Sequence, residues 1–253
     1  MELAGKTALV TGGAAGIGRA IVLRLAVERA AVVVVDVDED GAREASQAVA
    51  AAGGDARSFA ADVTRDADLA AAITFAEDTF GGLDLLVNNA GGYRRPVFPD
   101  APAERWTHHL DLNLRSVMVG IATALGPLRR RGGGAILNVA STAGLGLAPH
   151  PGPEYAAAKA AVMRLTACLA PLAEEGIRVN CVCPYTVRTE AVAHEIAAIQ
   201  ERGDDMPATY RGVILEPEDV ADAAVRLVED ESLVGRVLVL VGGREPELLP
   251  VES

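Results

Sequence analysis

The sequence is poor in cysteine and in basic residues, and each shortage narrows the possible functions. Three cysteines occur, at Cys168, Cys181 and Cys183, and this sparse, odd number is typical of a reducing compartment. Their surroundings lack the His/Cys spacing of a metal site, so we expect no metal and interpret all three as core packing. Lys and Arg number 23 against 35 acidic residues, and the net charge of −12 disfavours nucleic acid as a partner.

Long apolar runs and aromatic residues are also scarce. The apolar stretches have the length of strands, and none approaches that of a membrane-spanning helix. Glu2 and Gly5 stand where a basic and apolar leader segment would lie. We therefore expect a cytoplasmic protein with no membrane partner. The length of 253 residues suits one large domain, 1–253, and no repeat or linker divides it.

What the sequence does contain is an alternation of strand and helix patterns. Strands are expected at 7–10, 31–35, 57–60, 84–87, 135–139, 178–182 and 237–241. Helices are expected between them, at about 17–29, 39–52, 66–80, 103–130, 153–175 and 217–229. Several strands are unbroken Val/Ile/Leu runs, as in parallel sheets covered on both faces. The pattern predicts an α/β fold, a single doubly wound Rossmann domain with a parallel sheet of about seven strands. Pro171 is expected to kink or end its helix.

A glycine-rich segment, Thr11–Gly18, joins the first strand to the first helix and indicates a dinucleotide site. Glycines let the backbone approach a pyrophosphate, and the N-terminus of the helix offers N–H groups to the anion. The next strand ends at Asp36, whose carboxylate can accept hydrogen bonds from an adenosine ribose and would repel a 2′-phosphate. The residues expected to contact this part of the cofactor are Gly12, Ala15, Gly16, Ile17, Gly18 and Asp36.

The third strand is followed by Asp62 and Val63, which could contact the adenine ring. The alternative is a helix N-cap region in which Thr64 or Asp66 caps the next helix. Both roles can coexist, so Asp62 and Val63 are included among the expected cofactor contacts.

The fourth strand ends in Asn88-Asn89-Ala90-Gly91-Gly92, at the sheet edge where ligands bind in such folds. Adjacent Asn side chains can tie neighbouring strand ends together, and the small residues leave room for a flat ligand. An ordinary Asn-Gly turn is the alternative. We prefer the functional interpretation and expect Asn89, Ala90 and Gly91 to contact the cofactor.

Tyr155 and Lys159 lie four residues apart on one predicted helix and therefore share a face. A free phenol has a pKa near 10, about three units too high for a base at neutral pH. A nearby ammonium favours the phenolate, so we expect Lys159 to lower the pKa of Tyr155. Taken alone, such a pair would more often be an ordinary helical surface pair.

Two further polar residues change that balance. Ser141 follows the strand at 135–139 and would place its hydroxyl at the same sheet edge, although a Ser-Thr turn would also explain it. Asn113 lies between leucines in a helical segment, where it could be a buried structural amide or could bind a water that feeds protons to Lys159.

In order and approximate spacing, these motifs resemble those of the short-chain dehydrogenase/reductase family, over nearly the whole chain from Lys6 to Gly243. The resemblance implies NAD(P)(H)-dependent oxidation of alcohols or reduction of carbonyls. By resemblance, Tyr155 is the acid/base and Lys159 binds the nicotinamide ribose, so both also contact the cofactor. Ser141 would orient the substrate oxygen and Asn113 would hold the proton-relay water. The family commonly forms dimers or tetramers.

The cofactor is expected to be NAD(H). Family members that prefer NADP often carry a basic residue in the glycine turn or just after the second strand. Here Ala14-Ala15 and Val37 stand at those places, and neither can pair with a 2′-phosphate.

Two segments depart from the family pattern. The sixth strand is usually followed by Pro-Gly, whereas this chain has Pro184-Tyr185, and Tyr185 lacks the conformational freedom of glycine. Pro184, Val187 and Thr189 still match the expected cofactor contacts. The second departure is the segment Val-Gly-Gly at 241–243, in which a valine stands before the glycines where many relatives have an Asp. We attribute this change to subunit packing.

The segment at about 189–211 is expected to form a lid over the active site, rather than a plain surface loop. Arg94 and Arg95 could meet an anionic substrate, but a solvated loop face is favoured. The candidate wall residues of the substrate pocket are Gly92, Tyr93, Leu145, His150, Tyr185, His194 and Tyr210.

Together, these features predict an NAD(H)-dependent oxidoreductase that transfers a hydride to or from a small alcohol or ketone. A 3-oxoacyl-thioester reductase is an alternative, which Asp36 disfavours because such reductases usually prefer NADPH. A catalytically idle NAD(H)-binding sensor or scaffold is another, which the intact Ser141, Tyr155 and Lys159 disfavour.

Overall fold

One mixed sheet organises the protein, for which a computed structural model describes residues 1–146, 149–207 and 210–249. The strands lie in the order β3-β2-β1-β4-β5-β6-β7-β8, with β1 to β7 parallel and β8 antiparallel to β7. Their bounds are β1 Thr7–Thr11, β2 Ala31–Asp36, β3 Ala56–Ala60, β4 Leu85–Asn88, β5 Gly134–Val139, β6 Ile177–Pro184, β7 Val237–Leu240 and β8 Glu247–Leu249.

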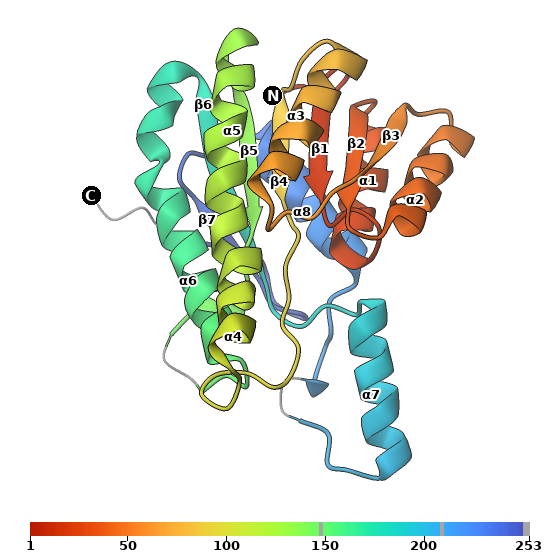
Figure 1. The fold of residues 1–253 in the computed structure, drawn as a ribbon, viewed down its shortest axis with the longest axis vertical. Helices are drawn as coiled ribbons and strands as arrows, with labels where there is room; N and C mark the ends of the chain where they lie inside the picture. Colours follow the sequence, from red (N-terminus) through yellow and green to blue (C-terminus); the bar gives the residue numbers. More distant parts are fainter. Residues whose placement is uncertain (147–148, 208–209, 250–253) are drawn as a thin grey trace.

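Helices cover both faces of this sheet (Figure 1). Buried side chains of α1, α2 and α8 pack on one face, and those of α3, α5 and α6 pack on the other. The bounds are α1 Gly16–Val27, α2 Glu39–Ala51, α3 Asp66–Phe80, α4 Ala103–Leu110, α5 Ser116–Arg130, α6 Pro153–Cys168, α7 Glu190–Arg202 and α8 Pro217–Glu229. The predicted doubly wound α/β fold is confirmed. Its central strands are unbroken apolar runs, because helices cover both faces of the sheet.

The predicted helices at 103–130 and 153–175 are each divided. A π-helical turn, Asp111–Arg115, separates α4 from α5. α6 ends at Cys168 and a 3-10 helix, Ala170–Glu175, follows it, as expected from Pro171, which cannot donate a backbone hydrogen bond. One strand and one α-helix were not predicted: β8, which has only three residues, and α7, which lies within the segment expected to form the lid.

The interpretation of all three cysteines as core packing is wrong for one of them. Cys181 and Cys183 are buried in β6, whereas Cys168 is exposed at the end of α6. Within the described ranges, no cluster of three or more His, Cys, Asp or Glu side chains is arranged to hold a metal ion. No helix in these ranges is both long and apolar enough to cross a membrane.

A buried carboxylate fixes the amino end of the sheet. Asp84 is 2% exposed, and it accepts hydrogen bonds from the Thr7 N–H at 3.0 Å and from Arg131 Nε and Nη2 at 3.1 and 3.2 Å. Burial opposes its charge, but the hydrogen bonds from Arg131 and Thr7 and the nearby Lys6 ammonium hold its pKa below the ordinary value. Asp84 therefore stabilises the folded state in its ionised form.

Asp84→Asn is expected to lower the free energy of unfolding at neutral pH by about 2 kcal/mol, because it removes the charge from these hydrogen bonds. A lowered pKa stabilises the fold above the unfolded-state value, and this stabilisation is lost as pH falls through the folded-state pKa. Urea unfolding at neutral and acid pH measures both effects, with the exposed Asp78→Asn as control. A stability difference that does not shrink at acid pH would contradict the ionic account.

Candidate active site

A cleft of about 1520 Å³ opens at the carboxyl ends of the parallel strands. It is lined by every residue that the sequence predicted for the cofactor, and by Ser141. The predicted site residues that line the cleft are Gly12, Ala15, Gly16, Ile17, Gly18, Asp36, Asp62, Val63, Asn89, Ala90, Gly91, Ser141, Tyr155, Lys159, Pro184, Val187 and Thr189. Asn113 is fully buried and stands behind the cleft wall. The fold therefore gathers residues from 12 to 189 into one site.

The glycine turn leaves no room for side chains. Gly16 has φ +52°, and a Cβ there would lie 3.0 Å from Thr189 Cγ2. A Cβ on Gly18 would overlap the Gly12 carbonyl oxygen. Among the described residues, no side chain caps the N-terminus of α1, and no acidic residue occurs in its first turn. The cleft therefore presents an uncapped, positively polarised helix end, which suits a phosphate.

Asp36 lies beside this turn at the end of β2. Its Oδ2 accepts a hydrogen bond from the Ala14 N–H at 3.0 Å, and its Oδ1 accepts one from the Asp38 N–H at 3.0 Å. These bonds hold the carboxylate at the rim of the cleft. The next residue, Val37, is 76% exposed and also lines the cleft.

The two asparagines at the end of β4 tie strand ends together, as expected. Asn88 Nδ2 donates to Asn138 Oδ1 of β5 at 2.9 Å. Asn89 Nδ2 donates to the carbonyl oxygens of Thr11 and Gly12 at 2.9 and 3.0 Å. The fourth strand is thereby fixed to β5 on one side and to the glycine turn on the other.

Asp62 forms a local turn after β3. Its Oδ1 accepts hydrogen bonds from the N–H and the hydroxyl of Thr64, at 2.9 and 2.7 Å. α3 begins at Asp66 with Arg65 at its N-cap, so the alternative in which Thr64 or Asp66 caps this helix is wrong. Asp62 and Val63 nevertheless both face the cleft.

Tyr155, Lys159 and Ser141 meet at the inner end of the cleft. Lys159 Nζ donates to the Val139 carbonyl at 2.8 Å and lies 5.7 Å from the centroid of the Tyr155 ring. Ser141 begins the turn after β5, where its Oγ accepts the Ala143 N–H at 3.2 Å, so the Ser-Thr turn considered as the alternative is present. The same hydroxyl hydrogen-bonds Tyr155.

Burial controls the proton affinities of this group. It raises the pKa of Tyr155 to about 12, although the hydrogen bond from Ser141 acts in the opposite direction. Burial also lowers the pKa of Lys159 to about 8. The expectation of a net lowering of the pKa of Tyr155 is therefore wrong in this structure, because desolvation of the phenolate outweighs the other contributions. At neutral pH, Tyr155 is protonated and can donate a proton.

Asn113 occupies the π-helical turn between α4 and α5. Its Nδ2 donates to the carbonyls of Gly92 and His109 at 2.7 and 2.8 Å, and its Oδ1 accepts the Gly92 N–H at 2.8 Å. Asn113 is therefore a buried structural amide, which was one of the two interpretations of this residue. A Cβ on Gly91 would lie 2.8 Å from Asn113 Oδ1 and 3.1 Å from Lys159 Nζ, so both groups lie next to Gly91 and leave no space for a side chain there.

The unusual Tyr185 is accommodated without strain. Its backbone does not adopt the left-handed conformation that favours glycine, and its N–H donates to the Leu240 carbonyl at 2.8 Å. The side chain lines the cleft and is 39% exposed. Near 242, a Cβ on Gly242 would overlap the Val213 carbonyl, so this glycine permits a close contact within the chain. The attribution of the 241–243 change to subunit packing stays a prediction.

Most of the expected substrate wall is present. Six of the seven expected residues line the cleft: Gly92, Tyr93, Leu145, His150, Tyr185 and Tyr210. The expectation for His194 is wrong, because it is exposed on α7, outside the cleft lining. The Tyr93 and His150 rings lie 5.1 and 5.7 Å from the Tyr155 ring, centroid to centroid. Arg94 and Arg95 are both exposed, and Arg94 reaches the cleft.

The predicted lid contains α7, which projects from the body of the protein beyond the carboxyl ends of the strands (Figure 1). Thr189 caps this helix by accepting the Val192 N–H, and Tyr210 Oη donates to Glu195 Oε2 at 2.6 Å. Residues 208 and 209 of the lid segment lie outside the described residues, as do 250–253 of the expected domain. Closure of this segment over a substrate stays a prediction.

Sequence reasoning missed two residues next to the site. His109 in α4 and Glu154 in α6 form a buried pair with 2.8 Å between Nδ1 and Oε1. The available signal was their place in the sequence: His109 lies four residues before Asn113, and Glu154 lies one residue before Tyr155. No sequence pattern shows that α4 and α6 meet there.

Comparison with known proteins agrees with this geometry. Residues 6–200 match the family model described as short chain dehydrogenase. The chain is 37% identical to (+)-borneol dehydrogenase 2 of Salvia officinalis over 260 residues, which cover 96% of this chain and 90% of the relative. The chain belongs to the short-chain dehydrogenase/reductase family.

A bacterial relative and a solved structure support the same assignment. The 3beta-hydroxysteroid dehydrogenase 1 of Eggerthella lenta is 36% identical over 247 residues, with 96% of this chain and 94% of the relative covered. A 7 alpha-hydroxysteroid dehydrogenase solved with NADH and 7-oxo glycochenodeoxycholic acid superposes with a TM-score of 0.85 at 32% identity, covering 96% of this chain and 95% of that one. The protein is thus an oxidoreductase of small-molecule hydroxyl or carbonyl groups.

The cleft fits the nicotinamide dinucleotide that this family uses. It extends from Asp36 to Lys159, and between them the glycine turn leaves the start of α1 open to a phosphate. The cleft has a carboxylate at one end, and an ammonium and a phenol at the other. These groups are of the kinds that can hydrogen-bond the hydroxyls of the two riboses and a reacting oxygen.

Proposed function

We propose that this protein is an NAD(H)-dependent oxidoreductase that acts on the hydroxyl or carbonyl carbon of a small molecule, with Tyr155 as the acid/base. The observation that carries this proposal is the convergence of Ser141, Tyr155 and Lys159 in the same cleft as Asp36 and the glycine turn. A binding module has no need of those three groups, which disfavours an idle sensor or scaffold.

The roles of the site residues follow from their positions. Asp36 would bind the adenosine ribose hydroxyls, and the start of α1 would bind the pyrophosphate. Lys159 would bind the nicotinamide ribose, with Pro184, Val187 and Thr189 along the same wall. When bound, the nicotinamide supplies or accepts the hydride. Tyr155 Oη donates its proton to the substrate oxygen during reduction and takes it back during oxidation, while the Ser141 hydroxyl orients that oxygen.

A proton source for Tyr155 is also proposed. Asn113 Oδ1 and Lys159 Nζ both lie close to the position that a Cβ on Gly91 would occupy. We assign Asn113 the role of holding the water through which Lys159 exchanges protons, in addition to the backbone contacts already described.

The proposed preference for NAD(H) rests on Asp36 and on the exposed, apolar Val37. The double variant Asp36→Ala/Val37→Arg is expected to raise the NADPH/NADH ratio of kcat/KM about a hundredfold, because it exchanges charge repulsion for a charge-assisted hydrogen bond. Steady-state kinetics with both cofactors measures the ratio. The matched control is Val37→Arg alone, which retains Asp36 and should shift the ratio less. An unchanged ratio in the double variant would refute the cofactor argument.

The proposed substrates are secondary alcohols and the corresponding ketones. The aromatic rings of Tyr93 and His150 beside Tyr155, together with the aliphatic Leu145, line the reacting end of the cleft. A panel of alcohols and ketones followed by NADH absorbance tests this, beginning with alicyclic secondary alcohols. We further propose that the protein is cytoplasmic and forms a homo-oligomer, either a dimer or a tetramer. Light scattering after size exclusion measures the oligomeric state.

A further inference from the structure

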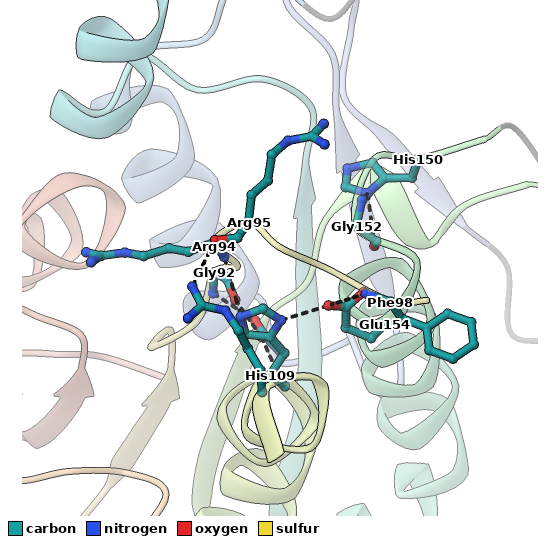
Figure 2. Close-up of polar contacts among 10 residues, drawn as sticks. Gly92, Arg94, Arg95, Phe98, His109, His150, Gly152 and Glu154 are labelled. Atoms are coloured by element: carbon teal, nitrogen blue, oxygen red, sulfur yellow. Dashed lines mark hydrogen bonds and ion pairs between the residues drawn. The ribbon is translucent and has the colours of Figure 1, made fainter. Parts of the chain in front are cut away.

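A buried acid–base pair lies beside the site, and neither member has a role in the proposed chemistry. Figure 2 shows His109 of α4 directed toward Glu154 of α6, with 2.8 Å between Nδ1 and Oε1. Their side chains are only 6% and 5% exposed. Glu154 immediately precedes Tyr155 in the sequence, and His109 lines the cleft.

The contacts of the imidazole determine where its proton lies. Nε2 faces the backbone N–H of Arg94 at 3.4 Å, and an N–H can only donate (Figure 2). Nε2 is therefore the acceptor nitrogen, and Nδ1 carries the hydrogen that is donated to Glu154. This geometry fits the Nδ1–H tautomer, with the carboxylate of Glu154 as the acceptor.

The pair connects three parts of the active site. Glu154 Oε1 also accepts the Phe98 N–H at 3.4 Å, so the carboxylate holds the segment 92–98 that follows β4. The backbone carbonyl of His109 accepts the hydrogen bond from Asn113 Nδ2 at 2.8 Å. Within the segment 92–98, Gly92 bonds both ends of the Asn113 amide, and the Tyr93 ring packs 5.1 Å from that of Tyr155.

Packing alone does not account for this pair. Glu154 Oε2 is buried and has no hydrogen-bond partner among the described residues, which is costly for a carboxylate. Burial works against its charge, but the hydrogen bonds from His109 and the Phe98 N–H hold the pKa of this carboxyl below its ordinary value. An apolar pair of similar volume would fill the space without that cost.

We propose that His109 and Glu154 are a positioning pair for catalysis: Glu154 selects the Nδ1–H tautomer of His109, and the pair fixes the 92–98 segment and the Asn113 turn relative to Tyr155. This inference rests on the proposed function, in which Asn113 and Tyr155 handle the proton. The pair itself does not touch the reacting atoms. Its effect is to hold the Asn113 amide and the Tyr93 ring in one arrangement beside Tyr155.

The tautomer can be measured directly in the wild-type protein, without any need for a substrate. The chain has four histidines, so the imidazole ¹⁵N resonances of His109 can be assigned by comparison with His109→Gln. At neutral pH, we expect a protonated Nδ1 and an unprotonated Nε2. Glu154→Gln keeps an oxygen acceptor and should retain this state, whereas Glu154→Leu should lose it. An Nε2–H or doubly protonated His109 in the wild-type protein would overturn the inference.

Kinetics then separates positioning from a structural role. Glu154→Leu is expected to lower kcat between about tenfold and about a hundredfold, because small misplacements of catalytic groups are this costly. NADH affinity, measured by fluorescence titration, should stay within about threefold of wild type, a change of less than 0.7 kcal/mol. Glu154→Gln should restore most of kcat, and adding His109→Phe to Glu154→Leu should cause little further loss. Glu174→Leu, which removes an exposed carboxylate outside the cleft, is the matched control.

The outcomes distinguish this inference from the proposed function. If Glu154→Leu lowers only the melting temperature and leaves the kcat of the folded enzyme unchanged, the pair is structural and the inference fails. If Tyr155→Phe retains wild-type turnover, the proposed function fails instead. Independent, additive losses from the two single variants would also contradict a pair that acts as one unit.

Discussion

Tyr155→Phe is expected to lower kcat about a thousandfold while leaving NADH affinity nearly unchanged. The variant removes only the phenolic oxygen, which carries the proton and accepts the hydrogen bond from Ser141. The ring, and with it the packing against Tyr93 and His150, remains. Stopped-flow or steady-state assays on an accepted ketone, together with a fluorescence titration with NADH, separate chemistry from binding.

The control for this variant is Tyr210→Phe. Tyr210 also lines the cleft and loses only its hydrogen bond to Glu195 on α7, so kcat should change far less than in Tyr155→Phe. Wild-type turnover by Tyr155→Phe on a verified substrate would show that the proton comes from another group. It would remove the basis of the proposed mechanism.

Lys159→Met is expected to lower kcat/KM by at least about a hundredfold and also to weaken NADH binding. Met has a similar shape, but it cannot hydrogen-bond a ribose, donate to the Val139 carbonyl or carry the positive charge next to Tyr155. A loss of both affinity and turnover distinguishes this variant from Tyr155→Phe, in which affinity is retained. Unchanged NADH affinity would contradict the assignment of Lys159 to the ribose.

The same variant has a stability signature. Burial lowers the pKa of Lys159 from its ordinary 10.5 to about 8, so between these pH values the unfolded chain binds a proton that the folded protein does not. Stability attributable to Lys159 therefore rises as pH increases from about 8 to about 10.5. Denaturant unfolding of wild type and Lys159→Met should show wild type gaining relative stability over this interval. A constant difference would contradict the lowered pKa.

Much of the fold could be predicted because parallel strands buried on both faces have a plain sequence signature. The runs at 31–35 and 135–139 left little ambiguity and differ from the observed strands by one residue each, and α8 begins and ends where its pattern placed it. β8 could not be predicted in the same way, since three residues between prolines have no periodicity. The division between α4 and α5 was hidden as well, because the sequence pattern does not show that the backbone hydrogen bonds change to the i→i+5 type over Asp111–Arg115.

The site was predictable where function depends on local order and less so where it depends on distant neighbours. The glycine turn, Asp36 and the Tyr155–Lys159 spacing are local sequence signals, and the residues predicted from them to contact the cofactor all line the cleft. The pKa of Tyr155 was predicted in the wrong direction, because its burial by surrounding elements cannot be estimated from one helix. His109 and Glu154 are 45 residues apart, and their contact exists only once α4 packs against α6.

Hydride transfer is the central claim, and isotope transfer tests it most directly. Wild-type protein is incubated with an accepted ketone and NADH deuterated at C4 of the nicotinamide, in unlabelled water, and the product alcohol is analysed by mass spectrometry. The account predicts one deuterium on the carbinol carbon, formed much faster by wild type than by Tyr155→Phe. If the alcohol product contains no deuterium with NADH labelled on one face of C4 and none with NADH labelled on the other, the account is contradicted.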